Sequence, residues 1–142
     1  MQLNVLDESG VQSFYKDYED KSIDHIDITA GRSAFLGDVI VNRRSVADLK
    51  RQMDYKFFNQ MSAVLNGHEK VVDGGPFVLF SGILAQRPGH GNTCLSIANA
   101  AVEASVKGLA NDLGFARKIR INCVSPGMTD TDTYAKMDKE KN

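Results

Sequence analysis

The sequence IRINCVSPG at residues 119–127 alternates apolar and polar side chains as far as Cys123 and then enters a proline–glycine turn. Alternation with a period of two is typical of a β-strand that ends in a turn of small residues. Upstream, the run FVLF at residues 77–80 is apolar throughout and follows the turn Asp73-Gly74-Gly75-Pro76. An unbroken apolar run suits a strand covered on both faces, as strands of parallel sheets are. The two segments therefore predict strands of a parallel sheet.

Two long segments repeat apolar residues at helical spacing. The first starts at Ser45, which forms a capping-box pattern with Asp48 three residues later, and it continues to Gly67. The second covers residues 93–113. The expected buried stripes are Val46, Leu49, Met53, Phe57, Met61 and Leu65 in the first helix, and Leu95, Ala98, Val102, Val106, Leu109 and Leu113 in the second.

The N-terminal part adds two strands and a helix. Residues 1–6 (MQLNVL) form a short apolar segment that we expect to be a strand, and Asp7 follows in the position of a helix cap. Ile26 and Ile28 alternate with polar residues before Ala30-Gly31, which predicts a further strand ending in a tight turn. Strands and helices that alternate in this way indicate an α/β fold, in which right-handed crossovers place parallel strands between two helical layers. With 142 residues and no internal repeat or linker, we expect one doubly wound domain.

Composition argues against several classes of function. Hydrophobic residues make up 42% and charged residues 25% of the chain, and no apolar run approaches the roughly 20 residues of a membrane span. The formal net charge of −1 gives no basic field for a nucleic-acid backbone. The first residues lack the basic and apolar regions of a secretory signal, so we expect a cytoplasmic protein. Cys94 and Cys123 are far apart and the histidines show no metal-ligand spacing, so we expect no metal site.

Four segments, in this order along the chain, resemble the middle of a short-chain dehydrogenase/reductase, from about Leu3 to Thr131. The most specific is Arg120–Gly127, which resembles the family pattern R-V-N-x-V-x-P-G and, together with Thr131, fits P-G-x-x-x-T. The other three are Asn4-Val5, which stands where the family has an Asp-hydrophobic pair, Ile28–Gly31, which resembles N-N-A-G, and Asp54-Tyr55-Lys56, which resembles the helix segment with the catalytic asparagine.

The resemblance implies a Rossmann-like fold and hydride transfer between NAD or NADP and a small carbonyl or alcohol substrate. In the family, the P-G-x-x-x-T segment lines the nicotinamide, and the residue at the position of Asn4 contacts the adenine. An amide oxygen at Asn4 still accepts a hydrogen bond, but without charge. The residue that separates NAD from NADP lies in a strand that has no match here, so both cofactors stay open. The implied cofactor-binding residues are Asn4, Val5, Ala30, Gly31, Pro126, Gly127 and Thr131.

The chain matches only part of the family pattern. No segment resembles the glycine-rich T-G-x-x-x-G-x-G turn that holds the pyrophosphate at a helix N-terminus. If Leu3 begins the family's third strand, the first two βα units are absent, and the last strand after Gly127 is absent too. In the strand order 3-2-1-4-5-6 this loss would leave a gap of roughly 14 Å in the sheet. We therefore expect residues 1–142 to form a single, incomplete Rossmann-like domain of low stability.

The family's catalytic residues are Asn, Ser, Tyr and Lys, of which Tyr transfers the proton and Lys lowers its pKa. At the matching positions this chain has Leu95 for Tyr and Asn99 for Lys, and Leu95 can transfer no proton. Ser81 is the candidate serine, although Gly82 fits the usual spacing at least as well. Lys56 stands at the asparagine position, and we hypothesise that it supplies the cation lost at position 99. The candidate catalytic residues are therefore Ser81, Lys56 and Asn99.

Each of these hypotheses has a simpler alternative. Lys56 would otherwise be an exposed helical lysine, and His90 and Tyr134 are weaker candidates for a substitute acid. The whole chain would otherwise be a non-catalytic relative or a fragment that acts in oligomerisation. Under either interpretation, we expect a homo-oligomer that pairs through the helices at residues 45–66 and 93–113.

Overall fold

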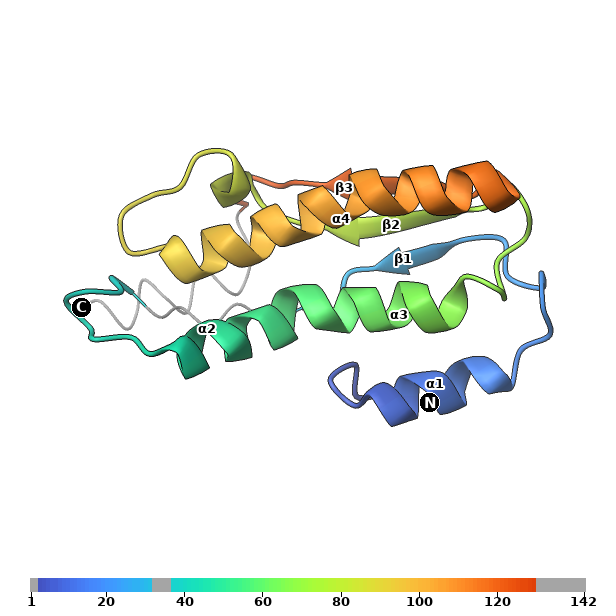
Figure 1. The fold of residues 1–142 in the computed structure, drawn as a ribbon, viewed down its shortest axis with the longest axis horizontal. Helices are drawn as coiled ribbons and strands as arrows, with labels where there is room; N and C mark the ends of the chain where they lie inside the picture. The colour runs from blue at the N-terminus through green and yellow to red at the C-terminus, as the bar shows by residue number, and fades with distance from the viewer. Residues whose placement is uncertain (1–2, 32–36, 130–142) are drawn as a thin grey trace.

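A computed structural model of the protein describes residues 3–31 and 37–129 of the chain. Within them, helices and strands alternate in the order expected from the second strand onward (Figure 1). The strands are β1 (Ile26–Ile28), β2 (Pro76–Phe80) and β3 (Arg120–Val124), and the helices are α1 (Glu8–Lys16), α2 (Val46–Met53), the π-helix η1 (Asp54–Phe58), α3 (Asn59–Gly67), the 3-10 helix η2 (Ile83–Ala85) and α4 (Thr93–Arg117).

The three strands form one sheet in the order β1-β2-β3, and both pairs are parallel. Ile28 stands opposite Leu79, and Leu79 stands opposite Cys123, so the strands end nearly level with one another. The parallel α/β architecture expected from the sequence is confirmed. All three strands therefore direct their carboxyl ends to the same edge of the sheet.

The segment before α1 is not a strand. Residues 3–6 contain a turn, in which the Asp7 backbone N–H donates to the Asn4 carbonyl oxygen at 3.0 Å and the Leu6 N–H donates to Asn4 Oδ1 at 3.2 Å. The prediction of a strand at residues 1–6 is thus wrong for the described part of that segment. A strand needs a neighbour for its ladder bonds, and no described strand lies beyond β1. The gap was expected between that predicted strand and β1, so it does not arise in the described part of the chain, where β1, β2 and β3 are direct neighbours as expected.

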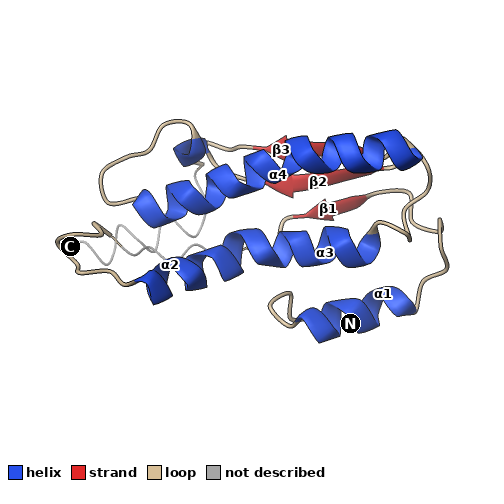
Figure 2. Cartoon of the chain, in the orientation of Figure 1, coloured by secondary structure: helices blue, strands red, loops and turns tan. Residues whose placement is uncertain are grey.

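One face of the sheet makes the core. Phe77 and Leu79 of β2 are fully buried, and they pack with Ile121 of β3, Val64 of α3 and Val102 of α4. In Figure 2, α4 crosses in front of β2 and β3. The opposite face is open in the described part of the chain, where Asp27, Arg120, Asn122 and Val124 are all exposed. The sequence predicted two helical layers, and the described helices form the layer over one face.

The long segment from Ser45 to Gly67 is helical, as expected, but η1 interrupts it with one stretch of wider helix. Its start is the predicted capping box: Asp48 N–H donates to Ser45 Oγ at 3.2 Å, and Ser45 N–H donates to Asp48 Oδ2 at 2.9 Å. The expected buried stripe is wrong at both ends, since Val46 is 71% and Leu65 58% exposed. The buried positions of α2 and α3 are Gln52, Asn59, Gln60, Val64 and Gly67.

Helix α4 follows its predicted stripe, with Ala98 and Val102 fully buried, and it continues four residues beyond the expected end to Arg117. Lys118 then takes a left-handed conformation with φ of 58°, and its N–H donates to the Gly114 carbonyl at 3.0 Å. This arrangement is a usual way to end a helix. No helix in the described residues is both long and apolar enough to span a membrane.

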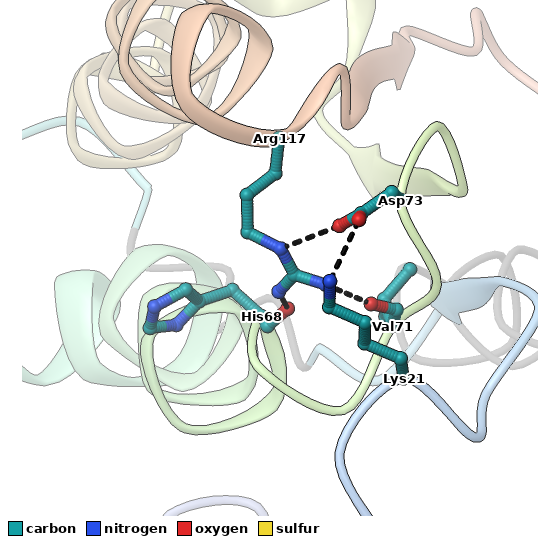
Figure 3. A network of polar contacts seen from close by, with 5 residues as sticks. All are labelled: Lys21, His68, Val71, Asp73 and Arg117. Atoms are coloured by element: carbon teal, nitrogen blue, oxygen red, sulfur yellow. Dashed lines mark hydrogen bonds and ion pairs between the residues drawn. The ribbon is translucent and has the colours of Figure 1, made fainter.

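A polar network fastens the end of α4 to the loop after α3 (Figure 3). Arg117 donates to the carbonyl oxygens of His68 and Val71, each at 2.6 Å, and its Nε donates to Asp73 Oδ1 at 2.8 Å. Lys21 binds the other oxygen of Asp73 at 2.7 Å. The network lies where β2 and β3 begin, so it supports the sheet from the edge opposite the strand ends.

Candidate functional site

Three turns meet at the carboxyl edge of the sheet. They are Ala30-Gly31 after β1, Ser81-Gly82 after β2, and residues 125–127 after β3. The last two are joined by backbone hydrogen bonds of 2.9 Å, from Ser81 N–H to the Val124 oxygen and from Ile83 N–H to the Pro126 oxygen. The turns after β1 and β3 are separated by two strand spacings, roughly 10 Å. The predicted placement of residues 30–31 and 126–127 at one edge is confirmed.

The first turn is held by the start of α3. Asn59 is 4% exposed, and its amide donates to the Ala30 carbonyl at 2.9 Å. A Cβ added at Gly31 would lie 3.4 Å from the Tyr55 backbone oxygen and 3.7 Å from Cδ of Lys56. The backbone at Gly31 therefore lies within ordinary van der Waals distance of η1.

Gln60 ties η1 to the middle strand. It is 1% exposed, and its Oε1 accepts from the Phe80 N–H at 2.8 Å. Its Nε2 donates to the carbonyl oxygens of Phe80 at 3.0 Å and of Lys56 at 2.6 Å. One side chain thus satisfies both backbone groups at the end of β2 and one carbonyl in the π-helix. Such wider helical turns are frequent at functional sites.

Lys56 extends from η1 toward the strand ends. It is half-buried, and burial lowers the pKa of its ammonium, an effect that the nearby Cys123 thiol partly opposes. Burial in turn raises the pKa of Cys123. Among the residues that the structure describes, the Lys56 ammonium has no hydrogen-bond or ion-pair partner. The alternative of an ordinary exposed lysine does not fit this placement.

Ser81 and Asn99 lie together but face into the fold. Ser81 is 4% exposed, and its hydroxyl contacts the Asn99 carbonyl oxygen and Glu103 Oε1, each at 3.1 Å. Asn99 is 2% exposed and packs on Gly82, where an added Cβ would lie 2.9 Å from Asn99 Nδ2. Asn99 Oδ1 is buried without a hydrogen-bond partner in the described structure. Ser81, through its hydroxyl, and Gly82, through its backbone, therefore both lie against Asn99.

Glu103 on α4 was not among the candidates from the sequence, yet it joins two turns of the site. Its Oε1 accepts from Ser125 Oγ at 2.9 Å as well as from Ser81, and its Oε2 accepts from Gln86 Nε2 at 3.3 Å. Partial burial raises the pKa of Glu103, but the hydrogen bonds from Ser125, Gln86 and Ser81 outweigh it and leave this pKa lowered. A charged residue inside the apolar stripe of a helix was the signal available in the sequence.

The remaining predicted cofactor residues do not gather in one place. Val5 and Ala30 line a cavity of about 180 Å³ beside β1, whereas Asn4 is exposed and engaged in its own turn. Pro126 and Gly127 are exposed and outside this cavity. Apolar side chains make up most of its wall, namely Leu3, Val11, Tyr15, Ile26, Ile28 and Ala63.

Several other candidates are unconnected with the site or are not described. Thr131 and Tyr134 lie outside the described residues. Leu95, at the expected tyrosine position, is half-buried, and His90 is an exposed loop residue whose Nε2 lies 3.4 Å from Asp38 Oδ2. In the described part of the chain, no three metal-ligating side chains come together.

Comparison with known proteins agrees with this geometry. A family model described as enoyl-(acyl carrier protein) reductase matches residues 1–142. The chain belongs to the short-chain dehydrogenase/reductase family. A 3-oxoacyl-(acyl-carrier-protein) reductase of Chlamydia muridarum is 29% identical over 125 residues, which are 86% of this chain and 48% of that protein. The short-chain dehydrogenase/reductase FrzI of Cladobotryum sp. is 28% identical over 109 residues, which are 69% of this chain and 42% of that protein.

Solved structures of the family show the same arrangement of elements. A small-chain dehydrogenase in complex with NADPH superposes with a TM-score of 0.82 at 30% identity, covering 98% of this chain and 62% of its own. A dehydrogenase/reductase from Sinorhizobium meliloti gives a TM-score of 0.80 at 25% identity. The Rossmann-like, incomplete α/β fold expected from the sequence is therefore confirmed. The chain spans about half the length of the curated relatives it matches.

Proposed function

We propose that this chain forms the nicotinamide side of an NAD(P)-dependent oxidoreductase that moves hydride between the cofactor and a small carbonyl or alcohol substrate in the cytoplasm. The observation that carries the proposal is the meeting of three strand-end turns at one edge, with the unpaired Lys56 ammonium among them. Ligands of open α/β sheets bind at the carboxyl ends of the strands. The NADPH held by a structurally similar dehydrogenase supports the same assignment.

The residues at this edge fit the nicotinamide end of such a cofactor. No atom of the described residues lies within 4 Å of a Cβ added at Gly127, which leaves room among them for a planar ring to approach the backbone of that turn. The buried Asn99 Oδ1 lacks a donor in the described structure, and a ribose hydroxyl is a donor of the right kind. When bound, the cofactor supplies or accepts the hydride, and the protein orients it.

We assign two roles to Lys56: it transfers the proton of the reaction, and it binds the ribose of the cofactor. Its lowered pKa favours release of a proton from the ammonium, which an ordinary lysine releases only at high pH. Leu95 has no proton to give, and the Ser81 hydroxyl is bound within the fold. Ser81 then acts by placing the Gly82 backbone. Asn99 acts by accepting a hydrogen bond from the ribose.

The proposal is tested by fluorescence titration of the chain with NADPH and with NADH, followed by turnover on simple ketones and alcohols. Lys56→Met removes the ammonium and should weaken binding roughly tenfold, the effect of losing one hydrogen bond from a charged group. Lys50→Met, at an exposed position of the same helical segment, is the matched control and should change nothing. Absence of binding with both cofactors, or equal affinities for the two variants, would contradict the proposal.

A second candidate is a non-catalytic relative that pairs with a like or related subunit through α2–α3 and α4. The observation in its favour is the group of exposed apolar side chains on the π-helix, α3 and α4, which includes Phe58, Leu65 and Ile97. Cofactor binding without turnover, together with self-association, would favour this candidate over the enzyme.

A further inference from the structure

Glu103 connects the turn after β2 with the turn after β3 through a single carboxylate oxygen. Ser125 Oγ donates to Oε1, and Ser81 Oγ lies 3.1 Å from it and shares its one proton between Oε1 and the Asn99 carbonyl. Gln86 reaches Oε2 from outside. The two serines come from neighbouring strands, and each stands directly at a strand end. The bridge through α4 therefore adds to the two backbone bonds, from Ser81 and from Ile83, that join the same turns.

The turn after β3 has few other attachments. Pro126 has no backbone N–H, and its carbonyl oxygen accepts from Ile83 N–H at 2.9 Å. An added Cβ at Gly127 would meet no atom within 4 Å in the part of the chain that the structure describes. Thr129 Oγ1 donates to the Gly127 carbonyl at 3.2 Å, but this bond stays within the segment after β3. Ser125 immediately precedes Pro126, and its 2.9 Å bond to Glu103 ties the segment to α4.

We propose that Glu103 is a positioning residue: through the two serine bonds it holds the turn at residues 125–127 against Ser81-Gly82, so that the backbone of Gly127 is presented to the nicotinamide. The inference rests on the proposed function, because it assigns Glu103 a part in cofactor binding. It adds a residue on α4 that contacts neither the cofactor nor the substrate. The effect of Glu103 passes through Ser125 to the turn.

The lowered pKa of Glu103 keeps this acceptor ionised at neutral pH. Hydrogen bonds to an ionised acceptor are roughly twice as strong as those between neutral groups. The titratable groups that face the carboxylate are Lys107, one turn further along α4, and the Cys123 thiol of β3.

The arrangement predicts how strongly each of three variants loosens the two turns. In Glu103→Gln, the amide oxygen can occupy the place of Oε1 and still accept from both serines, while only the outer contact to Gln86 is lost. Glu103→Ala removes both serine bonds. Gln86→Ala removes the outer contact alone and serves as the matched control.

The experiment measures amide hydrogen exchange of the full chain and its affinity for NADPH. In Glu103→Ala, exchange in peptides covering residues 79–85 and 122–128 should quicken roughly tenfold, and the dissociation constant for NADPH should rise by a similar factor, as loss of about one net hydrogen bond implies. Glu103→Gln should stay within about threefold of the unaltered chain on both readouts, and Gln86→Ala should match it. Ser125→Ala, which cuts only one tether, should affect residues 122–128 more than residues 79–85.

The two readouts separate failure of the inference from failure of the proposed function. If the unaltered chain binds no NADPH, the proposed function fails, and exchange alone shows whether Glu103 fixes the turns. Unchanged exchange in Glu103→Ala overturns the inference, and so does faster exchange with unchanged affinity. Equal effects of Glu103→Gln and Glu103→Ala would also overturn it, because they would show that charge, and not the serine bonds, matters. If Glu103→Ala does not fold, Ser125→Ala and Glu103→Gln carry the same comparison.

Discussion

At the scale of single residues, the charge of Lys56 lowers the stability of the fold and serves the proposed function. A half-buried ammonium with no partner among the described residues lowers the stability of the folded chain, since the charged form loses hydration that these residues do not replace. Residues that reduce stability in this way are common at functional sites, where activity and stability conflict. Removing the charge should therefore stabilise the protein while weakening the function assigned to it.

We expect Lys56→Met to raise the free energy of unfolding by about 1 kcal/mol at pH 7, the low end of the range for burying a polar group without a partner. The folded-state pKa of Lys56 lies below the ordinary 10.5, so the unfolded chain binds more protons between the two values. The unaltered protein should thus gain stability as pH rises through this window, and the advantage of the variant should shrink. Urea unfolding at several pH values measures both effects, and Lys50→Met should show neither.

At the scale of elements, the sequence predicts which segments are helices and strands better than which faces they bury. The apolar run at residues 77–80 and the helical spacing at residues 93–113 are local features of the sequence. The structure has the expected strand at the first and the expected helix at the second. The stripe is wrong at Leu65 because η1 changes the winding of the helix part-way, so positions beyond η1 no longer share a face with those before it. Val46 is exposed for another reason: it is the first residue of α2. The π-helix was not predicted either: Gln60 bonds the Lys56 carbonyl four residues earlier and also the backbone of Phe80 in β2, and the apolar spacing of the sequence reveals neither contact.

The candidate site shows the same division. Its glycines and prolines could be predicted because turn chemistry is local, and the parallel topology brought those turns to one edge. The side chains between them could not be assigned in the same way, because Gln60, Asn59 and Glu103 act on backbone or hydroxyl groups about 20 to 30 residues away in the chain. The strand predicted at residues 1–6 was wrong for a similar reason, since strand formation depends on a neighbouring strand that the local sequence does not reveal.

The Arg117 network gives a prediction at this scale. Its guanidinium bonds two carbonyl oxygens and Asp73 at once, and the side chain is only 19% exposed. In Arg117→Lys a single ammonium cannot reach all three acceptors, so we expect a loss of about 2 kcal/mol in the free energy of unfolding. Arg51→Lys is the matched control, because Arg51 is 52% exposed and pairs with Asp48 alone. Urea unfolding of both variants checks the prediction, and similar losses would show that the network adds no stability.

At the scale of the whole molecule, one sheet face and one helical surface are open in the described part of the chain. On the open sheet face, Asp27, Arg120 and Asn122 are polar, and Val124 is the one apolar residue among the exposed strand residues described there. The helical surface differs: Phe58 and Leu65, seven residues apart, are 52% and 58% exposed. An apolar row of this kind on a helix favours pairing with another helix. This contrast points to the helices, and not to the sheet, as the surface for a like subunit.

We therefore expect the chain to associate with itself through α3, and we expect Leu65→Glu to prevent the association. A charge placed in the apolar centre of an interface loses its hydration without gaining a partner, and one such change outweighs the few kcal/mol that separate dimer from monomer at micromolar concentration. Sedimentation velocity should show a species of at least twice the monomer mass for the unaltered chain and the monomer for Leu65→Glu. Phe115→Glu, at a residue 92% exposed near the end of α4, is the control and should associate normally. A monomeric unaltered chain, or dissociation by Phe115→Glu and not by Leu65→Glu, would place the pairing surface elsewhere or remove it.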